Sequence, residues 1–503
     1  MRHIPATMAT QHPDNASAPF WETDGDGFIS AQEEVREAYA AFSELNVDEY
    51  MWDWEGKYVD EAVVERLFSE YHEYFMETSL GRDKFLTFRI PNIWQEKGYS
   101  LARAFMAMLT AADMAQDLKI HTPPLFEVIL PMTESATQLI HIQETFGQLA
   151  KVKHRLFPNG GTSDFRHIEA IPLVEDVEGM FGIRKLLNSY THAHSQKFRK
   201  KIPYLRVFLA RSDPALISGM IAAVAGNKVA LSELTDWSAK NRIDVYPIIG
   251  TGSLPFRGGC NPENMDAFLN EYRGVRTVTI QSAFRYDYDL THVKHALTRL
   301  TNELPQAEPL IISVRHRKIL HEIVRKSTAQ YHQSVQKVAE AMFAVSSAVP
   351  PRRERRLHIG LLGYARKIGK KEFPRAITFT AAMYSLGVPP ELIGTGRTLR
   401  SLKEDEREVL RATYEHMEND IKLAGRFLNK ENLEMMTIAD ERWKPIQKDI
   451  QFLEEYFATE LGPREPHEFL HRNTTSDIYF LRQAGDDISD AVLRAGKLRK
   501  SLG

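Results

Sequence analysis

The chain has 503 residues, of which 43% are hydrophobic and 26% charged, with a formal net charge of −3. These proportions are typical of a globular protein, and the near-neutral charge argues against a dedicated surface for nucleic acid or membranes. The only cysteine, Cys260, excludes an intrachain disulfide and fits a reducing compartment. We expect it to be a packed residue rather than a nucleophile. Because residues 1–20 lack the apolar run of a signal peptide, the sequence predicts a cytoplasmic protein.

The N-terminal 30 residues show no helical pattern. The hexapeptide Thr10–Asn15 is rich in turn-forming residues, and Pro13 restricts His12 to an extended backbone. We therefore expect His12 to lie on a loop. The alternative is an exposed histidine on a mobile terminus.

After a mainly helical stretch from residue 30 to about 80, interrupted by the strand-like residues 50–55, the chain alternates regularly. Helical periodicity separates the strand-like runs, as in a parallel α/β sheet. Six to eight such units, with no dinucleotide-binding fingerprint after the first strand, favour a closed (β/α)8 barrel of the TIM type over an open sheet. The strand-like runs are 85–90, 124–130, 168–172, 205–210, 243–249 and 277–280, with 310–313 as a candidate last strand.

Beyond residue 313 the pattern becomes mostly helical. We predict that residues 1–313 form the barrel core with an N-terminal catalytic loop. Residues 314–503 are predicted to form a mainly helical region that packs on the barrel, contributes substrate arginines and makes subunit contacts.

A glycine-rich loop, Gly250–Gly259 (GTGSLPFRGG), follows the run 243–249. Its four glycines let the backbone approach a ligand, and successive amides in such a turn can bind an anion. Arg257 adds a planar cation suited to phosphate or carboxylate. The loop matches neither a Walker loop nor G-x-G-x-x-G. Alone, it indicates either an anion site or an ordinary turn with a surface arginine.

Charged and polar side chains recur near the ends of the predicted strands, where catalytic groups gather in a barrel. Arginines and carboxylates at such positions predict a site for a small dianion and a divalent cation. Carboxylate oxygens and water suit Mg²⁺ or Mn²⁺ better than zinc. The residues are Arg89, Glu127, Arg211, Asp213, Arg257, Gln281 and Arg285.

Each of these residues also has a structural interpretation. Glu127 could be a barrel-interior carboxylate paired with Arg89 or Arg211. Asp213 could cap the following helix, and Arg285 could belong to a structural ion pair. The glycine loop beside them favours the ligand site.

The motifs together resemble those of the short, archaeal-type phosphoenolpyruvate carboxylases. The resemblance covers nearly the whole chain, and its spacing is specific. It rests on Thr10–Asn15, Leu86–Asn92, Pro124–Glu127, Leu130–Ser135, Ala210–Ala215, Gly250–Gly259, Thr279–Arg285, Phe373–Ile377 and Gly387–Gly394.

The resemblance implies a carboxy-lyase that uses Mg²⁺ or Mn²⁺ to carboxylate phosphoenolpyruvate with bicarbonate, giving oxaloacetate and phosphate through carboxyphosphate and a metal-stabilised enolate. It also implies a barrel fold and usually a homotetramer. It assigns the metal to Glu127 and Asp213, and it makes His12, Arg89 and Arg257 catalytic, with Arg257 on a mobile glycine loop. The residues expected to hold substrate are Arg89, Arg285, Arg375, Arg366, Gly258, Gly259, Gln281 and Arg211.

The long bacterial and plant enzymes of this class carry an additional arginine where Thr251 stands and a lysine where Leu216 stands. Which groups replace those charges here stays open. One alternative function is another Mg²⁺-dependent barrel lyase or aldolase acting on a phosphorylated or 2-keto acid. Another is a non-catalytic sensor of an anionic metabolite. The basic run Arg352–Arg356 could bind a regulator, although we favour exposure to solvent.

Overall fold

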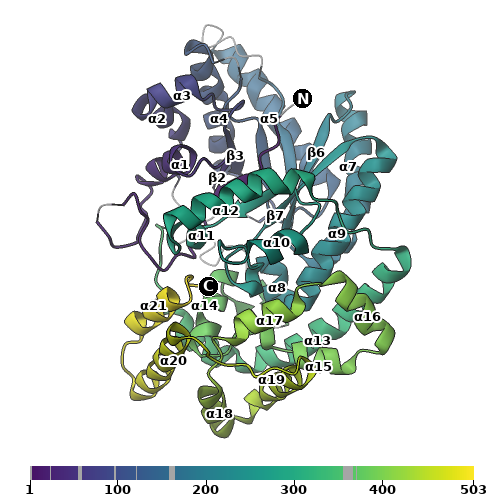
Figure 1. The fold of residues 1–503 in the computed structure, drawn as a ribbon. Helices are drawn as coiled ribbons and strands as arrows, with labels where there is room; N and C mark the ends of the chain where they lie inside the picture. Colours follow the sequence, from purple (N-terminus) through teal and green to yellow (C-terminus); the bar gives the residue numbers. More distant parts are fainter. Residues whose placement is uncertain are drawn as a thin grey trace.

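The structure, a computed structural model, describes residues 3–22, 24–54, 59–95, 98–120, 122–157, 165–354, 366–369 and 371–503. Its N-terminal part is a closed barrel of eight parallel strands in sequential order (Figure 1). This confirms the predicted (β/α)8 barrel. The strands are β1 (Thr7–Thr10), β2 (Glu49–Asp53), β3 (Phe85–Arg89), β4 (Glu127–Leu130), β5 (Glu169–Val174), β6 (Tyr204–Ala210), β7 (Asp244–Gly250) and β8 (Thr277–Ile280).

The barrel closes through its first strand. Met8 of β1 pairs with Glu49 of β2 on one side and with Thr279 of β8 on the other. The prediction of a last strand at residues 310–313 is wrong, because that segment forms no strand. The strand that completes the barrel is instead β1 (Thr7–Thr10), which lies in the segment that shows no regular pattern in the sequence.

Helices cover the outside of the barrel, so the strands are buried on both faces and read as apolar runs. Gly219, which has a φ of 87°, ends α8, and the single long helix α9 begins directly after it. The helices of this part of the chain are α1 (Glu34–Ser43), α2 (Val63–Glu70), α3 (His72–Glu77), α4 (Tyr99–Asp117), α5 (Ala136–Leu156), α6 (Val177–Phe181), α7 (Ile183–Phe198), α8 (Ser212–Ser218), α9 (Met220–Asn241), η1 (Pro255–Arg257), α10 (Met265–Glu271), α11 (Ser282–Tyr286) and α12 (Leu290–Glu303).

The rest of the chain is a helical region that lies below the barrel in Figure 1. Apolar residues of α8 and α9 share one core cluster with α13 and α14, so this region packs on the barrel helices. Among the described residues, no helix has the length and hydropathy of a membrane span. The elements are η2 (Leu304–Gln306), α13 (Val314–Ser346), β9 (Arg366–Ile368), β10 (Lys371–Phe373), α14 (Ala376–Ser385), η3 (Pro390–Leu392), α15 (Thr395–Ser401), α16 (Glu404–Thr413), α17 (Met417–Gly425), α18 (Lys430–Ala439), η4 (Glu441–Trp443), α19 (Lys444–Tyr456), α20 (Pro466–Ala484) and α21 (Ser489–Leu498).

The last residues of the sequence return to the barrel. The amide of Leu502 donates to the carbonyl of Asp14 at 2.7 Å, and the hydroxyl of Ser501 donates to the same carbonyl at 3.3 Å. In Figure 1 the C-terminus accordingly lies between the barrel and α14. The segment that contains His12 is therefore held by a part of the chain almost 500 residues away.

Candidate active site

The inward-facing side chains of the barrel form layers along its axis. Residues two apart on a strand share a face, so Glu49, Met51 and Asp53 of β2 lie at successive depths. An apolar layer fills the middle of the barrel and separates a polar layer at the amino ends of the strands from another at the carboxyl ends. The apolar cluster comprises Met8, Met51, Ile129, Ile171, Leu173, Phe208, Ala210 and Ile248.

Glu127 belongs to the polar layer at the amino ends. Its Oε2 accepts a hydrogen bond from Arg206 at 2.8 Å, and its Oε1 accepts one from the Tyr204 hydroxyl at 2.7 Å. Arg206 also donates to Glu49 across the barrel at 2.6 Å. The strand β6 runs on from Arg206 for roughly 13 Å before the loop that carries Asp213 begins.

The prediction that Glu127 and Asp213 hold the same metal ion is therefore wrong. The two carboxylates lie at opposite ends of the barrel, with the apolar layer between them. The structural interpretation of Glu127 is the better one, since it is a buried carboxylate paired with an arginine. That arginine is Arg206, and neither Arg89 nor Arg211 fills this role.

A different acidic pair lies at the carboxyl ends of β4 and β6. Glu134 follows β4 and is exposed, and the amide of the preceding Thr133 donates to Leu173 of β5 at 3.0 Å. This bond holds the Glu134 loop against the end of β5. Asp213 lies half-buried in the first turn of α8, directly after β6. Because only β5 separates β4 from β6, the two loops start about 10 Å apart. Carboxylates reaching inward from both sides could share one cation.

This donor set fits a hard divalent cation. Within the described ranges, no group of three or more histidine, cysteine, aspartate or glutamate side chains has metal-binding spacing. A site built on Glu134 and Asp213 would leave the remaining positions to water and substrate oxygens. Mg²⁺ is commonly bound in that way.

His12 lies just after the end of β1, at the same end of the barrel as Asp213. It is half-buried, and its Nδ1 lies 2.9 Å from the hydroxyl oxygen of Thr10. Two residues on, Asp14 accepts a hydrogen bond from the amide of Ala283 at 2.7 Å. This bond fixes the His12 loop to the segment that follows β8. The prediction that His12 lies on a loop is confirmed.

The Arg257 side chain is enclosed by polar partners and is only 1% exposed. Its Nη1 donates to Asp14 at 2.9 Å and to the main-chain oxygen of Gly503, its Nη2 donates to Gln281, and its Nε donates to the Ser212 hydroxyl at 3.2 Å. Burial lowers the pKa of Arg257, an effect that the charge of Asp14 opposes. Arg257 thus joins the β1, β6 and β8 loops and the end of the chain at one point.

The glycines of the loop have positions that other residues would strain. Gly258 and Gly259 have φ values of 119° and 70°, and a Cβ on Gly252 would lie 2.7 Å from the guanidinium carbon of Arg257. Residues 250–260 are buried throughout. In this conformation the loop is packed against the barrel, and Cys260 beside it is buried, as predicted. Burial also raises the pKa of the Cys260 thiol to about 12.

Two further arginines expected to bind substrate have acidic partners at the carboxyl end. Arg89, the last residue of β3, donates to Asp53, the last residue of β2, at 2.9 Å. Arg285 donates to Glu37 at 3.0 Å. This contact supports in part the alternative that Arg285 belongs to a structural ion pair. Its Nη1, however, is buried without a hydrogen-bond partner among the described residues. That N–H is available to a ligand oxygen.

Arg375 and Arg366 come from the helical region. Arg375 is half-buried and directly precedes α14. Arg366 begins β9, but its side chain lies outside the described part of the structure. Their roles in substrate binding stay predictions.

The position of Arg211 contradicts the prediction that this residue binds substrate. It is fully buried, and its guanidinium donates to the Tyr272 hydroxyl at 2.9 Å and to the carbonyls of Phe256 and Pro255 at 2.9 and 3.3 Å. The side chain therefore points into the protein beneath the glycine loop. The position directly after a strand is shared by ligand-binding and loop-supporting arginines, so the sequence alone could not separate the two.

The two arginines that begin the basic run, Arg352 and Arg353, are not exposed to solvent. Arg352 donates to the carbonyls of Asn15 and Ala16, the latter at 2.7 Å, and Arg353 donates to Glu37 at 2.6 Å. Both arginines are at most 5% exposed. The prediction of solvent exposure is wrong for these two residues. Arg352 holds the segment that follows His12, and Arg353 holds α1. The end of the run, residues 355 and 356, lies outside the described residues.

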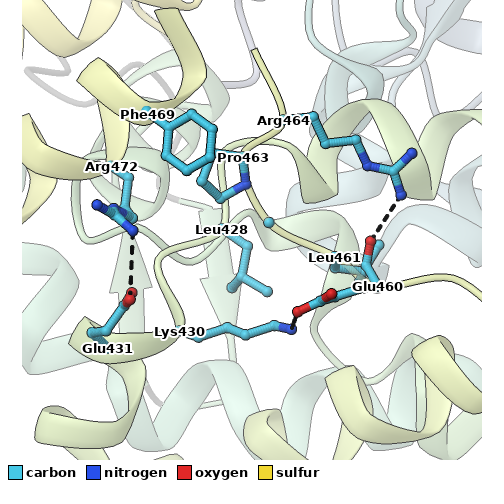
Figure 2. A pocket seen from close by; sticks show the side chains of 10 residues that line it. Leu428, Lys430, Glu431, Glu460, Leu461, Pro463, Arg464, Phe469 and Arg472 are labelled. Atoms are coloured by element: carbon cyan, nitrogen blue, oxygen red, sulfur yellow. Dashed lines mark hydrogen bonds and ion pairs between the residues drawn. The ribbon is translucent and has the colours of Figure 1, made fainter. Parts of the chain in front are cut away.

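A cavity of about 460 Å³ lies in the helical region rather than at the barrel mouth (Figure 2). Two of its cationic side chains already have acidic neighbours, since Lys430 lies 2.8 Å from Glu454 and 3.3 Å from Glu460, and Arg472 lies 3.6 Å from Glu431. None of the predicted site residues lines it. We therefore assign the chemistry to the mouth of the barrel.

Comparison with known proteins gives the same family along the whole chain. The family described as phosphoenolpyruvate carboxylase matches residues 4–503. The phosphoenolpyruvate carboxylase of Leuconostoc mesenteroides is 44% identical over 503 residues, covering 100% of this chain and 99% of the relative. That of the archaeon Metallosphaera sedula is 38% identical over 521 residues, covering 100% of both chains. The chain belongs to the phosphoenolpyruvate carboxylase family, and to its short, archaeal type.

Proposed function

We propose that this protein carboxylates phosphoenolpyruvate with bicarbonate, forming oxaloacetate and phosphate with the help of Mg²⁺ or Mn²⁺. The observation that carries the proposal is the convergence of a histidine, several arginines and acidic side chains at the carboxyl ends of the barrel strands. Each group comes from the last residue of a strand or from the segment that follows one. They are His12, Arg89, Glu134, Asp213, Arg257, Gln281 and Arg285.

We further propose that Glu134 and Asp213 hold the divalent cation, in place of the predicted pair. When bound, the cation supplies positive charge beside the enolate oxygen of the substrate. The arginines of the mouth would neutralise the phosphoryl and carboxylate oxygens, with the buried Nη1 of Arg285 as one ready donor.

The reaction proceeds by attack of a bicarbonate oxygen on the phosphorus of phosphoenolpyruvate, which breaks the bond between phosphorus and the enolate oxygen. Carboxyphosphate then loses its proton and splits into phosphate and CO2, and the enolate carbon attacks the CO2. We assign the proton transfer to His12, because an imidazole has a pKa suited to general-base work near neutral pH. The packed glycine loop around Arg257 would exclude water, which otherwise would protonate the enolate to give pyruvate.

A coupled assay tests this function. The purified protein is mixed with phosphoenolpyruvate, bicarbonate and Mg²⁺ in the presence of malate dehydrogenase and NADH. We expect NADH oxidation that requires all three components. Turnover of phosphoenolpyruvate that does not depend on bicarbonate would point instead to another lyase or aldolase, and binding without turnover would point to a sensor.

The assembly state and location are proposals of the same kind. The resemblance to the short enzymes supports a homotetramer, and the single cysteine supports a cytoplasmic location. Light scattering of the purified protein would test the tetramer, for which we expect a mass close to four times that of one 57.6 kDa chain.

Replacing His12 with alanine should separate the two halves of the reaction. We expect the rate of oxaloacetate formation to fall by about 10²- to 10⁴-fold, the range for loss of a general base. Binding of phosphoenolpyruvate, followed by quenching of tryptophan fluorescence, should change little. Pyruvate and phosphate released in a bicarbonate-dependent way would support the assignment, whereas undiminished oxaloacetate output would remove His12 from the mechanism.

Replacing Gly503 with valine should disturb Arg257 indirectly. A Cβ at this position would lie 2.1 Å from the carbonyl of Ile377 and 2.6 Å from the amide of Ala381, so a side chain must displace the last residues. Arg257 would lose one acceptor, and we expect kcat to fall by about 10²-fold, as for a misplacement of 1 Å. Gly98, where a Cβ would meet nothing within 4 Å, supplies a matched control as Gly98→Ala. Equal activity of Gly503→Val and the control would contradict this role of the chain end.

A further inference from the structure

Two ionisable side chains hold the glycine loop on the side that faces away from the barrel mouth. The short turn η1 (Pro255–Arg257) carries Arg257 at its end. Arg211, fully buried, donates to the carbonyl of Phe256 at 2.9 Å and to that of Pro255 at 3.3 Å. The Tyr272 hydroxyl, at 2.9 Å from Nε, fixes the direction of the guanidinium.

The second side chain, Glu391, comes from the helical region. It lies in η3 (Pro390–Leu392), and its Oε1 accepts hydrogen bonds from the amide of Phe256 at 2.7 Å and from the Tyr384 hydroxyl at 2.7 Å. Glu391 is fully buried. The Phe256 ring packs against Phe379 of α14, with 5.7 Å between ring centroids. The amide, the carbonyl and the ring of Phe256 are thus all held.

This arrangement controls the residue that follows. The carbonyl of Phe256 belongs to the peptide group that joins it to Arg257, so a rotation of this group would swing the Arg257 side chain away from Asp14 and Gln281. Arg211, bound to that carbonyl, opposes the rotation directly. The Phe256 amide that Glu391 accepts from belongs to the preceding peptide group, so Glu391 fixes the other side of Phe256. Hydrogen bonds to charged groups in a buried setting are among the stronger ones in proteins.

We propose that Arg211 and Glu391 are positioning residues, which aim Arg257 at the reacting atoms by fixing the turn that carries it. The inference rests on the proposed function of Arg257 and deepens it. Neither residue touches substrate in this role. The helical region thereby takes part in catalysis through Glu391, although its side chain lies behind the glycine loop.

The test compares substitutions that keep or remove the restraint on Phe256. Arg211→Ala and Glu391→Leu remove it, whereas Glu391→Gln keeps an oxygen that can accept from the Phe256 amide. Arg276→Ala is the matched control, because Arg276 also donates to two backbone carbonyls, those of Leu304 and Ala307, far from the loop. All variants are studied as the full chain, and thermal unfolding reports whether each is folded.

The activity readout is the ratio of oxaloacetate to phosphate formed. We expect Arg211→Ala and Glu391→Leu to lower kcat by about 10- to 10²-fold, the range for a misplaced catalytic group, while the KM for phosphoenolpyruvate changes far less. The product ratio should fall below one, because a loose loop admits water to the enolate. Glu391→Gln should stay near the wild type, and Arg276→Ala should keep a ratio of one.

Hydrogen exchange of the peptide spanning residues 250–260 gives a readout that does not depend on turnover. Exchange should be faster in Arg211→Ala and Glu391→Leu, and unchanged in Glu391→Gln and Arg276→Ala. Wild-type exchange and product ratio in folded Arg211→Ala and Glu391→Leu would overturn the proposal. Equal losses of exchange protection and product ratio in Arg276→Ala would also overturn it. A wild-type protein that forms no oxaloacetate would refute the proposed function instead, and exchange would still decide whether these residues hold the turn.

Discussion

Substituting Arg257 with alanine is expected to reduce kcat for oxaloacetate by about 10³-fold, near the upper range for loss of one preorganised donor. The reason is that its guanidinium meets Asp14, Ser212, Gln281 and Gly503 at once. Removal of the side chain frees all four groups and opens the mouth to water. Phosphoenolpyruvate should then be converted partly to pyruvate and phosphate, so the loss in oxaloacetate should exceed the loss in phosphate.

The same substitution breaks a buried ion pair with Asp14, so folding must be measured beside activity. Loss of one partner from such a pair costs about 3–5 kcal/mol. Arg257→Lys is the second variant, because it keeps the charge but cannot contact every acceptor, and we expect an intermediate loss of oxaloacetate. Wild-type carboxylation by folded Arg257→Ala would exclude the loop from the mechanism.

Substituting Glu134 with glutamine is expected to reduce kcat/KM at fixed Mg²⁺ by about 10²-fold or more, because loss of a charged ligand removes several kcal/mol of electrostatic stabilisation. The apparent affinity for the metal should fall as well. Part of the loss should be recovered at high Mg²⁺ or Mn²⁺ concentration. Asp213→Asn should behave in the same way.

Glu127→Gln is the matched control, since it makes the same chemical change at the other end of the barrel. Glu127 is bound to Arg206 and Tyr204, so we expect a loss of about 3 kcal/mol of stability rather than a change in metal dependence. Titration of Mn²⁺ followed by electron paramagnetic resonance measures binding directly. Weakened binding in Glu127→Gln but not in Glu134→Gln would contradict the reassignment of the metal ligand.

Local sequence was sufficient for most of the barrel. The strand predicted at residues 277–280 has the same bounds in the structure, because a short run of β-branched residues is flanked by Gly274 and Gln281. The first strand was missed because Thr7–Thr10 is short and largely lacks a periodic pattern. Its pairing with β8 joins residues about 270 positions apart, which local pattern cannot show.

Asp213 and Arg257 became candidates because they follow predicted strands, whereas His12 came from the family resemblance, since the strand before it was not predicted. Glu134, which we propose as a metal ligand, was not singled out, although this residue lies in a motif that supports the family resemblance. The run 124–130 looks like one strand, but β4 begins only at Glu127, so that residue lies at the amino end. An acidic residue after Pro131, where the strand has ended, was the better candidate on the same barrel rule.

The partners of the buried arginines could not be predicted from the local sequence. Arg211 acts through carbonyls 44 and 45 positions later, and Arg353 acts through Glu37, 316 positions earlier. Such pairs depend on the packing of the whole chain. An arginine in sequence indicates an anionic or carbonyl partner, but only the fold shows whether that partner is a ligand or the protein itself.

The reaction at the barrel mouth is tested most directly with bicarbonate labelled with heavy oxygen in every position. The purified protein converts phosphoenolpyruvate, and mass spectrometry then follows the label. If bicarbonate attacks phosphorus and carboxyphosphate breaks at its carbon–oxygen bond, each phosphate carries one labelled oxygen and the new carboxylate of oxaloacetate carries two. Oxaloacetate formed with unlabelled phosphate, or no oxaloacetate at all, would contradict the account.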